Sequence, residues 1–253
     1  MKYLSYLVCL ALAITTSGCF EMLEDIYLNN DGTGKYQITV DMSGMFDDPF
    51  MGEMMKKSIA EQTGGEELEI DSLINFSEIS PGGLPPTLTD NDRELIGCTE
   101  IRMRMSEKEK IGNIIFSFPF ESMDDLNDFQ ETFARLQEES EPGSGAMSGL
   151  LSGGISNGNK TKWSLSGRTL NRDVNTAAVA EEMEDMDDET MEMMKMFLAD
   201  ATFTTTYHLP GKVKKCSIPG ASVDGKMVSL TYSILDAMEE QPDTGGTIKF
   251  KKK

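Results

Sequence analysis

The residues best suited to chemistry are methionines, which occur 19 times and crowd together with carboxylates between positions 183 and 196. The methionines of this stretch are Met183, Met186, Met191, Met193, Met194 and Met196. Thioether sulfur is a soft ligand that suits copper(I), so a Met-rich acidic helix could store or sense a soft metal.

The alternative is the apolar face of a helix, which needs residues spaced by threes and fours. That spacing is present in Met183, Met186, Thr190, Met193 and Phe197. Methionine is also a common filler of hydrophobic cores. We therefore expect packing to explain most of the run and keep copper binding as the second hypothesis.

Catalytic chemistry needs a nucleophile beside a base, and the chain has a single histidine, His208. We expect His208 at the end of a strand just before Pro210, in a structural role. The chain has no Gly-x-Ser-x-Gly turn, no His-Glu-x-x-His helix and no phosphate-binding Gly-Lys loop. The sequence therefore predicts no enzyme, no catalytic residue, no cofactor and no metal ligand outside the methionine hypothesis.

The first eighteen residues have the pattern of an export signal. Lys2 and the amino terminus are positive, Leu4 to Ile14 are apolar, and Thr15 to Gly18 are mostly small residues before Cys19. The apolar run is shorter than the roughly 20 residues that a membrane-spanning helix needs. We expect residues 1–18 to be a signal peptide and residues 19–253 to form one exported domain.

The residues Thr16-Ser17-Gly18-Cys19 resemble the lipobox of bacterial lipoproteins. The resemblance implies that Cys19 receives a diacylglyceryl group, that cleavage follows Gly18, and that the new amino terminus is acylated, typically by palmitate. Two or three acyl chains hold a protein to a membrane far more firmly than one. We expect a lipid-anchored protein of the cell envelope, with the outer membrane as the default location because Phe20 is not the aspartate that favours retention in the inner membrane.

Cys98 and Cys216 remain once Cys9 leaves with the signal and Cys19 carries lipid. An oxidising envelope favours their pairing, so we expect a Cys98–Cys216 disulfide. The alternative is two separate buried thiols that act as small apolar side chains.

The formal net charge of −20 sets limits on the partners of the chain. A body this acidic is repelled by phosphate groups, so we expect no nucleic-acid binding. We expect the membrane to be reached through the N-terminal lipid.

Alternating and helical patterns predict an α+β fold, with a mainly antiparallel sheet built from β-hairpins and helices packed on one face. The predicted hairpins are 22–28 with 35–42, 99–105 with 111–118, and a short pair about Ser166-Gly167. Helices are predicted from Thr89 or Asp90 to Ile96 and after Ser122, which forms a capping box with Asp125. Further strands are expected at 201–209, 226–233 and 247–251, helices at 46–59 and 177–199, and a flexible Gly/Ser-rich insertion at 139–160.

Two turn-rich segments resemble the LppM-type envelope lipoprotein domain and lipoproteins of Bacteroidota. They are Asp31-Gly32-Thr33-Gly34-Lys35-Tyr36 and Tyr207-His208-Leu209-Pro210-Gly211-Lys212-Val213, the second followed by Val223-Asp224-Gly225-Lys226. The resemblance implies an α+β domain on a lipid anchor that handles envelope lipids or glycolipids. We therefore expect a non-enzymatic binding or scaffold module for an envelope lipid, glycan or protein partner.

Overall fold

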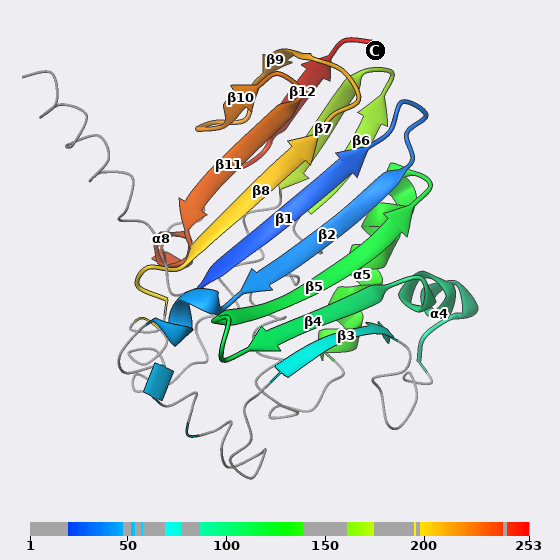
Figure 1. Ribbon diagram of the computed structural model, residues 1–253. Helices are drawn as coiled ribbons and strands as arrows, with labels where there is room; N and C mark the ends of the chain where they lie inside the picture. The colour runs from blue at the N-terminus through cyan, green and yellow to red at the C-terminus, as the bar shows by residue number, and fades with distance from the viewer. Residues whose placement is uncertain are drawn as a thin grey trace, which may run out of the picture.

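The computed structural model describes residues 20–47, 52–53, 57, 69–76, 87–138, 161–174, 195, 198–239 and 242–252. Its largest element is an eight-stranded sheet in the order β10-β11-β8-β1-β2-β5-β4-β3 (Figure 1). The strands are β1 (Glu21–Leu28), β2 (Gly34–Asp41), β3 (Glu69–Asn75), β4 (Glu100–Ser106), β5 (Ile111–Phe120), β8 (Thr202–His208), β10 (Ser222–Asp224) and β11 (Met227–Ser233). Neighbouring strands are antiparallel except β1 and β8, which run parallel.

A second layer covers one face of this sheet and consists of a four-stranded sheet and a helix. The smaller sheet has the order β6-β7-β12-β9, with β6 (Thr161–Ser166), β7 (Thr169–Val174), β12 (Gly246–Phe250) and β9 (Val213–Cys216). Helix α5 (Met123–Glu138) lies beside β6 and under β5, behind the large sheet in the view of Figure 1. Shorter elements are η1 (Ser43–Phe46), α4 (Asp90–Gly97) and α8 (Ile234–Glu239).

The alternation of β1 shows why one face of the large sheet is buried. Met22, Glu24, Ile26 and Leu28 are buried, and the residues between them are only partly covered. A strand turns successive side chains to opposite faces, so these four point toward the second layer. The core of the protein therefore lies between the two layers.

Helix α5 begins at a capping box, as its sequence predicts. The Ser122 hydroxyl accepts a hydrogen bond from the Asp125 amide, and the Asp125 carboxylate accepts one from the Ser122 amide. From this start, Met123, Leu126, Phe129 and Phe133 recur along one side and are all buried. The helix consequently presents an aromatic stripe to the large sheet.

The predicted fold class is confirmed: the protein is α+β with mainly antiparallel sheets and helices on one face. The hairpins β1–β2, β4–β5 and β6–β7 form where the patterns predict them. Residues 68–79, whose pattern leaves a short strand and a helix equally open, contain strand β3, and the short strands β9 and β10 were not predicted. Residues 1–19, the insertion at 139–160 and the methionines at 183–196 lie outside the described residues. Of the helix predicted at 46–59, only residues 46–47, 52–53 and 57 are described, and Gly52, Glu53 and Lys57 are helical.

The predicted Cys98–Cys216 disulfide is not formed, and both residues are free cysteines. The reason lies in the topology. Cys98 follows α4 beside the β3–β4 edge of the large sheet, whereas Cys216 ends β9 at the far edge of the small sheet (Figure 1). Cys216 is partly buried and packs against the core, and Cys98 is exposed to solvent, so the alternative of two buried thiols is wrong for Cys98 and only partly met by Cys216.

Candidate functional site: a buried polar cluster beside an aromatic void

A carboxylate and a guanidinium are buried together between the two layers. Glu24 of β1 and Arg172 of β7 each expose about one-twentieth of their side chain, at 6% and 5%. Arg172 Nη2 lies 3.9 Å from Glu24 Oε2, which is an ion pair without a close hydrogen bond. Removing charges from water is costly, so each of the two is tolerated in the core because the other is present.

Two hydroxyls complete the surroundings of Glu24. Tyr36 Oη of β2 donates to Glu24 Oε1 at 3.0 Å, and Thr205 Oγ1 of β8 donates to Glu24 Oε2 at 2.7 Å. Both strands neighbour β1 in the sheet. Glu24 thus has a hydrogen-bond donor for each oxygen, and Arg172 is left with unused donors.

Several polar atoms around Arg172 make no hydrogen bond of ordinary geometry within the described part of the chain: Arg172 Nε and Nη1, Gln130 Oε1, Trp163 Nε1 and Tyr207 Oη. The Trp163 and Arg172 side chains nevertheless lie close enough to the Tyr207 hydroxyl to interact with it, as Gln130 does with the Tyr36 hydroxyl. Their side chains are all buried. Buried polar groups normally have well-aligned partners, so a concentration of poorly satisfied ones favours the binding of polar atoms from outside the chain, either from water or from a ligand. We call Glu24, Tyr36, Gln130, Trp163, Arg172, Thr205 and Tyr207 the interior polar cluster.

The pKa values in this cluster keep its tyrosines neutral. Burial raises the pKa of Tyr36 well above its ordinary value, and the nearby charge of Glu24 adds to the effect. Burial likewise raises the pKa of Tyr207 to about 12, against a lowering by Arg172. Burial acts to lower the pKa of Arg172, but interactions with Tyr207 and Glu24 outweigh it and raise that pKa. The cluster therefore holds one buried positive and one buried negative charge with neutral hydroxyl groups around them.

Each member is positioned by an element whose sequence fixes its direction. Glu24 occupies the inward phase of β1 between Met22 and Ile26. Trp163 and Arg172 are cross-strand partners in the β6–β7 hairpin. The Asn127 amide of α5 accepts from the Trp163 amide and donates to its carbonyl, both at 2.9 Å. Asn127 thereby pairs the edge of β6 to the helix that carries Gln130.

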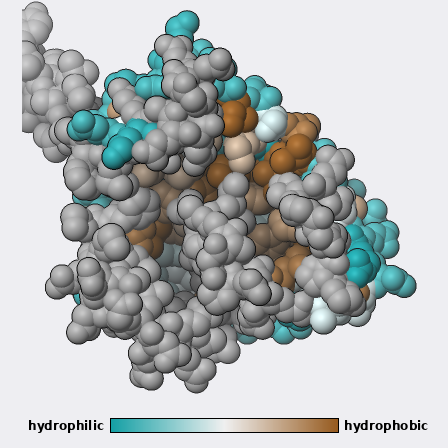
Figure 2. Space-filling model, turned by 90° about the horizontal axis from the view of Figure 1, so that it is seen from below, coloured by the Kyte–Doolittle hydropathy of each residue, from teal (hydrophilic) through white to brown (hydrophobic). Residues whose placement is uncertain are grey.

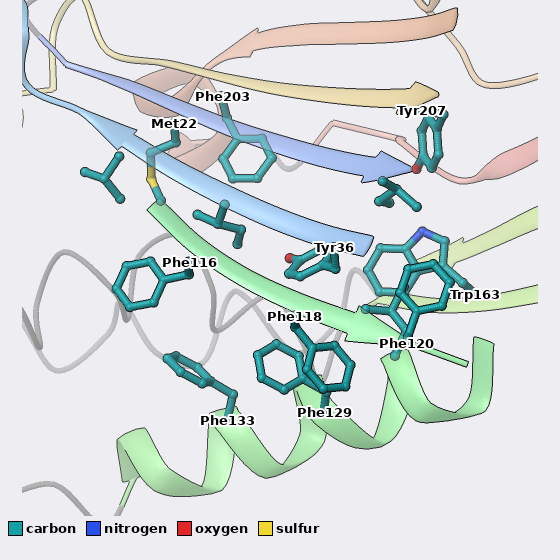
Figure 3. Close-up of a cluster of buried hydrophobic side chains, with 14 of the residues drawn as sticks. Met22, Tyr36, Phe116, Phe118, Phe120, Phe129, Phe133, Trp163, Phe203 and Tyr207 are labelled. Atoms are coloured by element: carbon teal, nitrogen blue, oxygen red, sulfur yellow. The ribbon is translucent and has the colours of Figure 1, made fainter. Parts of the chain in front are cut away.

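An aromatic void adjoins the cluster under α5. It is lined by Tyr36, Ile38, Phe116, Ser117, Phe118, Phe129 and Phe133, and its volume is about 10 Å³. Phe129 stacks on Phe118 with ring centroids 4.1 Å apart, and both lie over β5 (Figure 3). Tyr36 belongs to both the void and the cluster, since its ring meets Phe129 and Trp163 edge-on and its hydroxyl reaches Glu24.

Among the described residues seen in Figure 2, hydrophobic ones lie across the middle of the view and hydrophilic ones lie toward its edges. A void of about 10 Å³ is at the lower limit of the size that admits one water molecule. A larger apolar group would therefore need α5 to move away from β5.

The other predicted site residues lie elsewhere. Cys19 and the methionines at 183–196 are outside the described residues. His208 lies on the opposite face of the large sheet, where Nε2 is 2.6 Å from Asp25 Oδ1 and the ring stacks on Tyr27 at 4.1 Å. Searching the described residues for three or more His, Cys, Asp or Glu that could hold a metal ion finds no such group. Within the same residues, no helix is long and apolar enough to cross a bilayer.

Sequence reasoning missed the interior polar cluster, although one signal for it is present. Glu24 stands in the inward phase of β1, and Arg172 stands two residues after buried Leu170 in β7. A charged residue in the inward phase of a strand needs a buried partner. Finding that partner requires the contact between two sheets, which spacing along the chain does not reveal.

Comparisons with known proteins give little further guidance. No protein-family model matches the chain, and no curated protein matches it. Among solved structures, the NMR structure of the LppM folded domain from Mycobacterium tuberculosis matches with a TM-score of 0.37 and 9% identity, over 94% of this chain and 92% of that one. A likeness at this level establishes neither a shared fold nor a shared function.

Proposed function

We propose that the chain is a lipid-anchored lipoprotein of the cell envelope, without enzymatic activity, that binds an amphipathic envelope molecule between its two layers. The anchor is Cys19 at the end of the export signal, and the outer membrane is the proposed location. The observation that carries the binding proposal is the group of unsatisfied polar atoms around buried Arg172, directly beside a void lined by aromatic rings.

The ligand's polar group is matched to the cluster. Arg172 and Trp163 have only donor hydrogens to offer, and the Tyr207 hydroxyl can donate or accept. A group rich in acceptor oxygens, such as a phosphate, a carboxylate or a sugar hydroxyl, satisfies these atoms together. Arg172 contributes a planar fork of donors that suits an oxyanion, and Gln130 Oε1 accepts from a ligand hydroxyl.

The ligand's apolar part is matched to the space under α5. Phe129 and Phe133 of the helix face Phe116 and Phe118 of β5 across the void (Figure 3). Small pockets that take an apolar chain are lined by such side chains, with few polar groups to fix orientation. Ligand entry then involves a movement of α5 from β5, because the closed void is too small for an acyl chain.

Native mass spectrometry of the chain purified from its own envelope in a non-ionic detergent tests the proposal. We expect a co-purifying amphipathic molecule, and we expect an Arg172→Lys variant to lose most of it, since lysine keeps the charge and removes the fork of donors. The matched control is Arg104→Lys, because Arg104 lies on β4 with 41% of its side chain exposed. An empty wild-type protein would contradict the proposal, and bound copper would favour the methionine hypothesis instead.

A further inference from the structure

The outer face of the four-stranded sheet carries two parallel rows of polar side chains. The first row crosses the sheet through Lys215, Lys249, Thr169 and Ser166, and the second through Ser217, Thr247, Asn171 and Ser164. Ile248 and Leu170, which alternate with these residues, are buried in the core. We call the two rows together the lysine face.

The first row contains an arrangement that the fold alone does not favour. Lys215 and Lys249 are directly opposite each other in the β9–β12 pair, and both are exposed. Like charges in such cross-strand positions destabilise a sheet. No ion pair of either lysine is present in the part of the chain that the structure describes. Two lysines thus occupy directly opposed positions on neighbouring strands, and neither has an ion pair among the described residues.

More basic residues border this row, and backbone contacts hold them there. The Phe250 amide donates to the Arg168 carbonyl at 3.1 Å, and the Lys251 amide donates to the Lys212 carbonyl at 2.8 Å. Gly211 makes the second contact possible, because a Cβ at this position would lie 1.9 Å from the Lys251 carbonyl oxygen. Lys214 and Lys252, which are close to these residues in the sequence, are also exposed to solvent. A molecule with a net charge of −20 therefore concentrates positive charge at one end of its small sheet.

The second row adds neutral hydrogen-bonding groups. Ser217 Oγ accepts from the Thr247 amide at 2.9 Å, and Asn171 Nδ2 donates to Ser164 Oγ at 3.2 Å. The exposed large hydrophobic residues among those described are Leu73, Val223 and Met227, and none of them belongs to this sheet. Protein partners usually bind through a buried apolar or aromatic centre, which the lysine face does not offer.

The position of the lysine face also separates it from the start of the chain. β1 begins just after Phe20 at the lower left of Figure 1, and β12 ends near the C-terminus at the top. β1 alone spans about 26 Å at roughly 3.3 Å per residue, which exceeds the Debye length of about 8 Å at physiological salt. A membrane surface at the N-terminal end therefore lies beyond the reach of these charges.

We propose that the lysine face binds an acidic polysaccharide. Lys215 and Lys249 bind the carboxylates of a uronic acid, and the flanking hydroxyls and the Asn171 amide bind the sugar hydroxyls. Successive residues on one side of a strand are about 6.7 Å apart and neighbouring strands about 4.8 Å apart, so the rows present a flat lattice of donors and acceptors to an extended glycan. The proposal rests on different residues from the interior polar cluster and stands independently of it.

Isothermal titration of the chain in a non-ionic detergent with polygalacturonate oligosaccharides tests this. We expect binding at low salt, about tenfold weaker in a Lys215→Gln/Lys249→Gln variant because two solvent-exposed ion pairs are lost. The control Lys57→Gln/Lys108→Gln removes the same charge from other exposed positions and should bind as the wild type does. A variant with Thr169→Val and Asn171→Ala should also bind more weakly with its net charge unchanged.

Other polymers decide between a glycan site and plain charge attraction. We expect neutral dextran, phosphatidylglycerol vesicles and single-stranded DNA to bind less tightly than polygalacturonate. Equal binding of all three anionic probes, or wild-type affinity in the Thr169→Val/Asn171→Ala variant, would overturn the assignment to a glycan. Wild-type affinity in the double lysine variant would overturn the site itself.

Discussion

The interior polar cluster and the lysine face differ in how their charged side chains are paired. In the interior, Arg172 lies beside one carboxylate, and Tyr36 and Thr205 supply that carboxylate with hydrogen bonds. On the lysine face, Lys215 and Lys249 lie opposite each other on neighbouring strands, and both are exposed. The difference follows from the surroundings: an unpaired charge in the core costs several kcal/mol, while a like-charge pair in water costs at most about 1 kcal/mol. The interior charges are therefore paired with each other, whereas the two lysines on the surface are left for a ligand to neutralise.

The largest expected effect comes from breaking the interior pair. A Glu24→Gln variant leaves Arg172 charged and uncompensated in the core, so we expect the free energy of unfolding to fall by about 3–5 kcal/mol. Urea denaturation measures this change. Glu100→Gln is the matched control on exposed β4 and should stay within about 0.5 kcal/mol of the wild type.

A double variant sharpens the same point. Glu24→Gln/Arg172→Met removes both charges, so we expect it to recover much of the stability that Glu24→Gln loses. A double variant no more stable than the single one would mean that the charge pair is not what the core requires.

Asp92 is a buried carboxylate that accepts several hydrogen bonds, and we expect its removal to change the free energy of unfolding by an intermediate amount. Burial acts to raise the pKa of Asp92, but hydrogen bonds from Thr132, Thr89 and Arg135 outweigh it and lower that pKa from 3.8 to about 2. Because the folded pKa is below the unfolded one, ionised Asp92 stabilises the fold above about pH 4. This contribution is lost as the pH falls from about 4 to about 2.

The corresponding variant is Asp92→Ala, which removes the capping box of α4 and the contacts to α5. We expect a loss of about 2 kcal/mol at pH 7. Urea denaturation from pH 2 to pH 7 checks both statements, and the difference between variant and wild type should shrink toward the acid end. A difference that stays constant across this range would contradict the assigned pKa.

The smallest energetic effect is expected on the lysine face, and its sign is opposite. A Lys249→Thr variant removes the like-charge pair and introduces a residue that favours strands, so we expect a gain of up to about 1 kcal/mol in the free energy of unfolding. Thermal denaturation at low salt measures it. Lys108→Thr in the β4–β5 turn is the control, and a loss of stability in Lys249→Thr would argue against repulsion between Lys215 and Lys249.

Much of the fold could be predicted because it is local. Alternating apolar and polar residues predict the hairpins, and the capping box of Ser122 and Asp125 predicts the start of α5. The parallel pairing of β1 with β8 joins residues nearly two hundred positions apart in a register that no local pattern contains. β9 was missed because two of its four residues are lysines, and the bulge between Lys249 and Phe250 breaks the alternation.

The sites were harder to predict than the fold. Glu24 was one of 43 acidic residues until the structure placed it against Arg172. The net charge of −20 likewise concealed the lysine face, since a sum over the chain carries no information on where charges gather. The predicted disulfide was wrong for a similar reason. The positions of Cys98 and Cys216 in the sequence do not reveal that the topology places them in different parts of the fold.

The central proposal is that the interior accepts an amphipathic molecule whose polar group binds Arg172. A high-resolution crystal structure of the chain purified from its own envelope tests this most directly. Our account predicts continuous density between the layers, with an acceptor oxygen within about 3 Å of Arg172 Nε or Nη1 and an apolar chain between Phe116 and Phe133. Density for isolated water molecules alone, bridging Arg172, Gln130 and Tyr207 with α5 closed on β5, would contradict it.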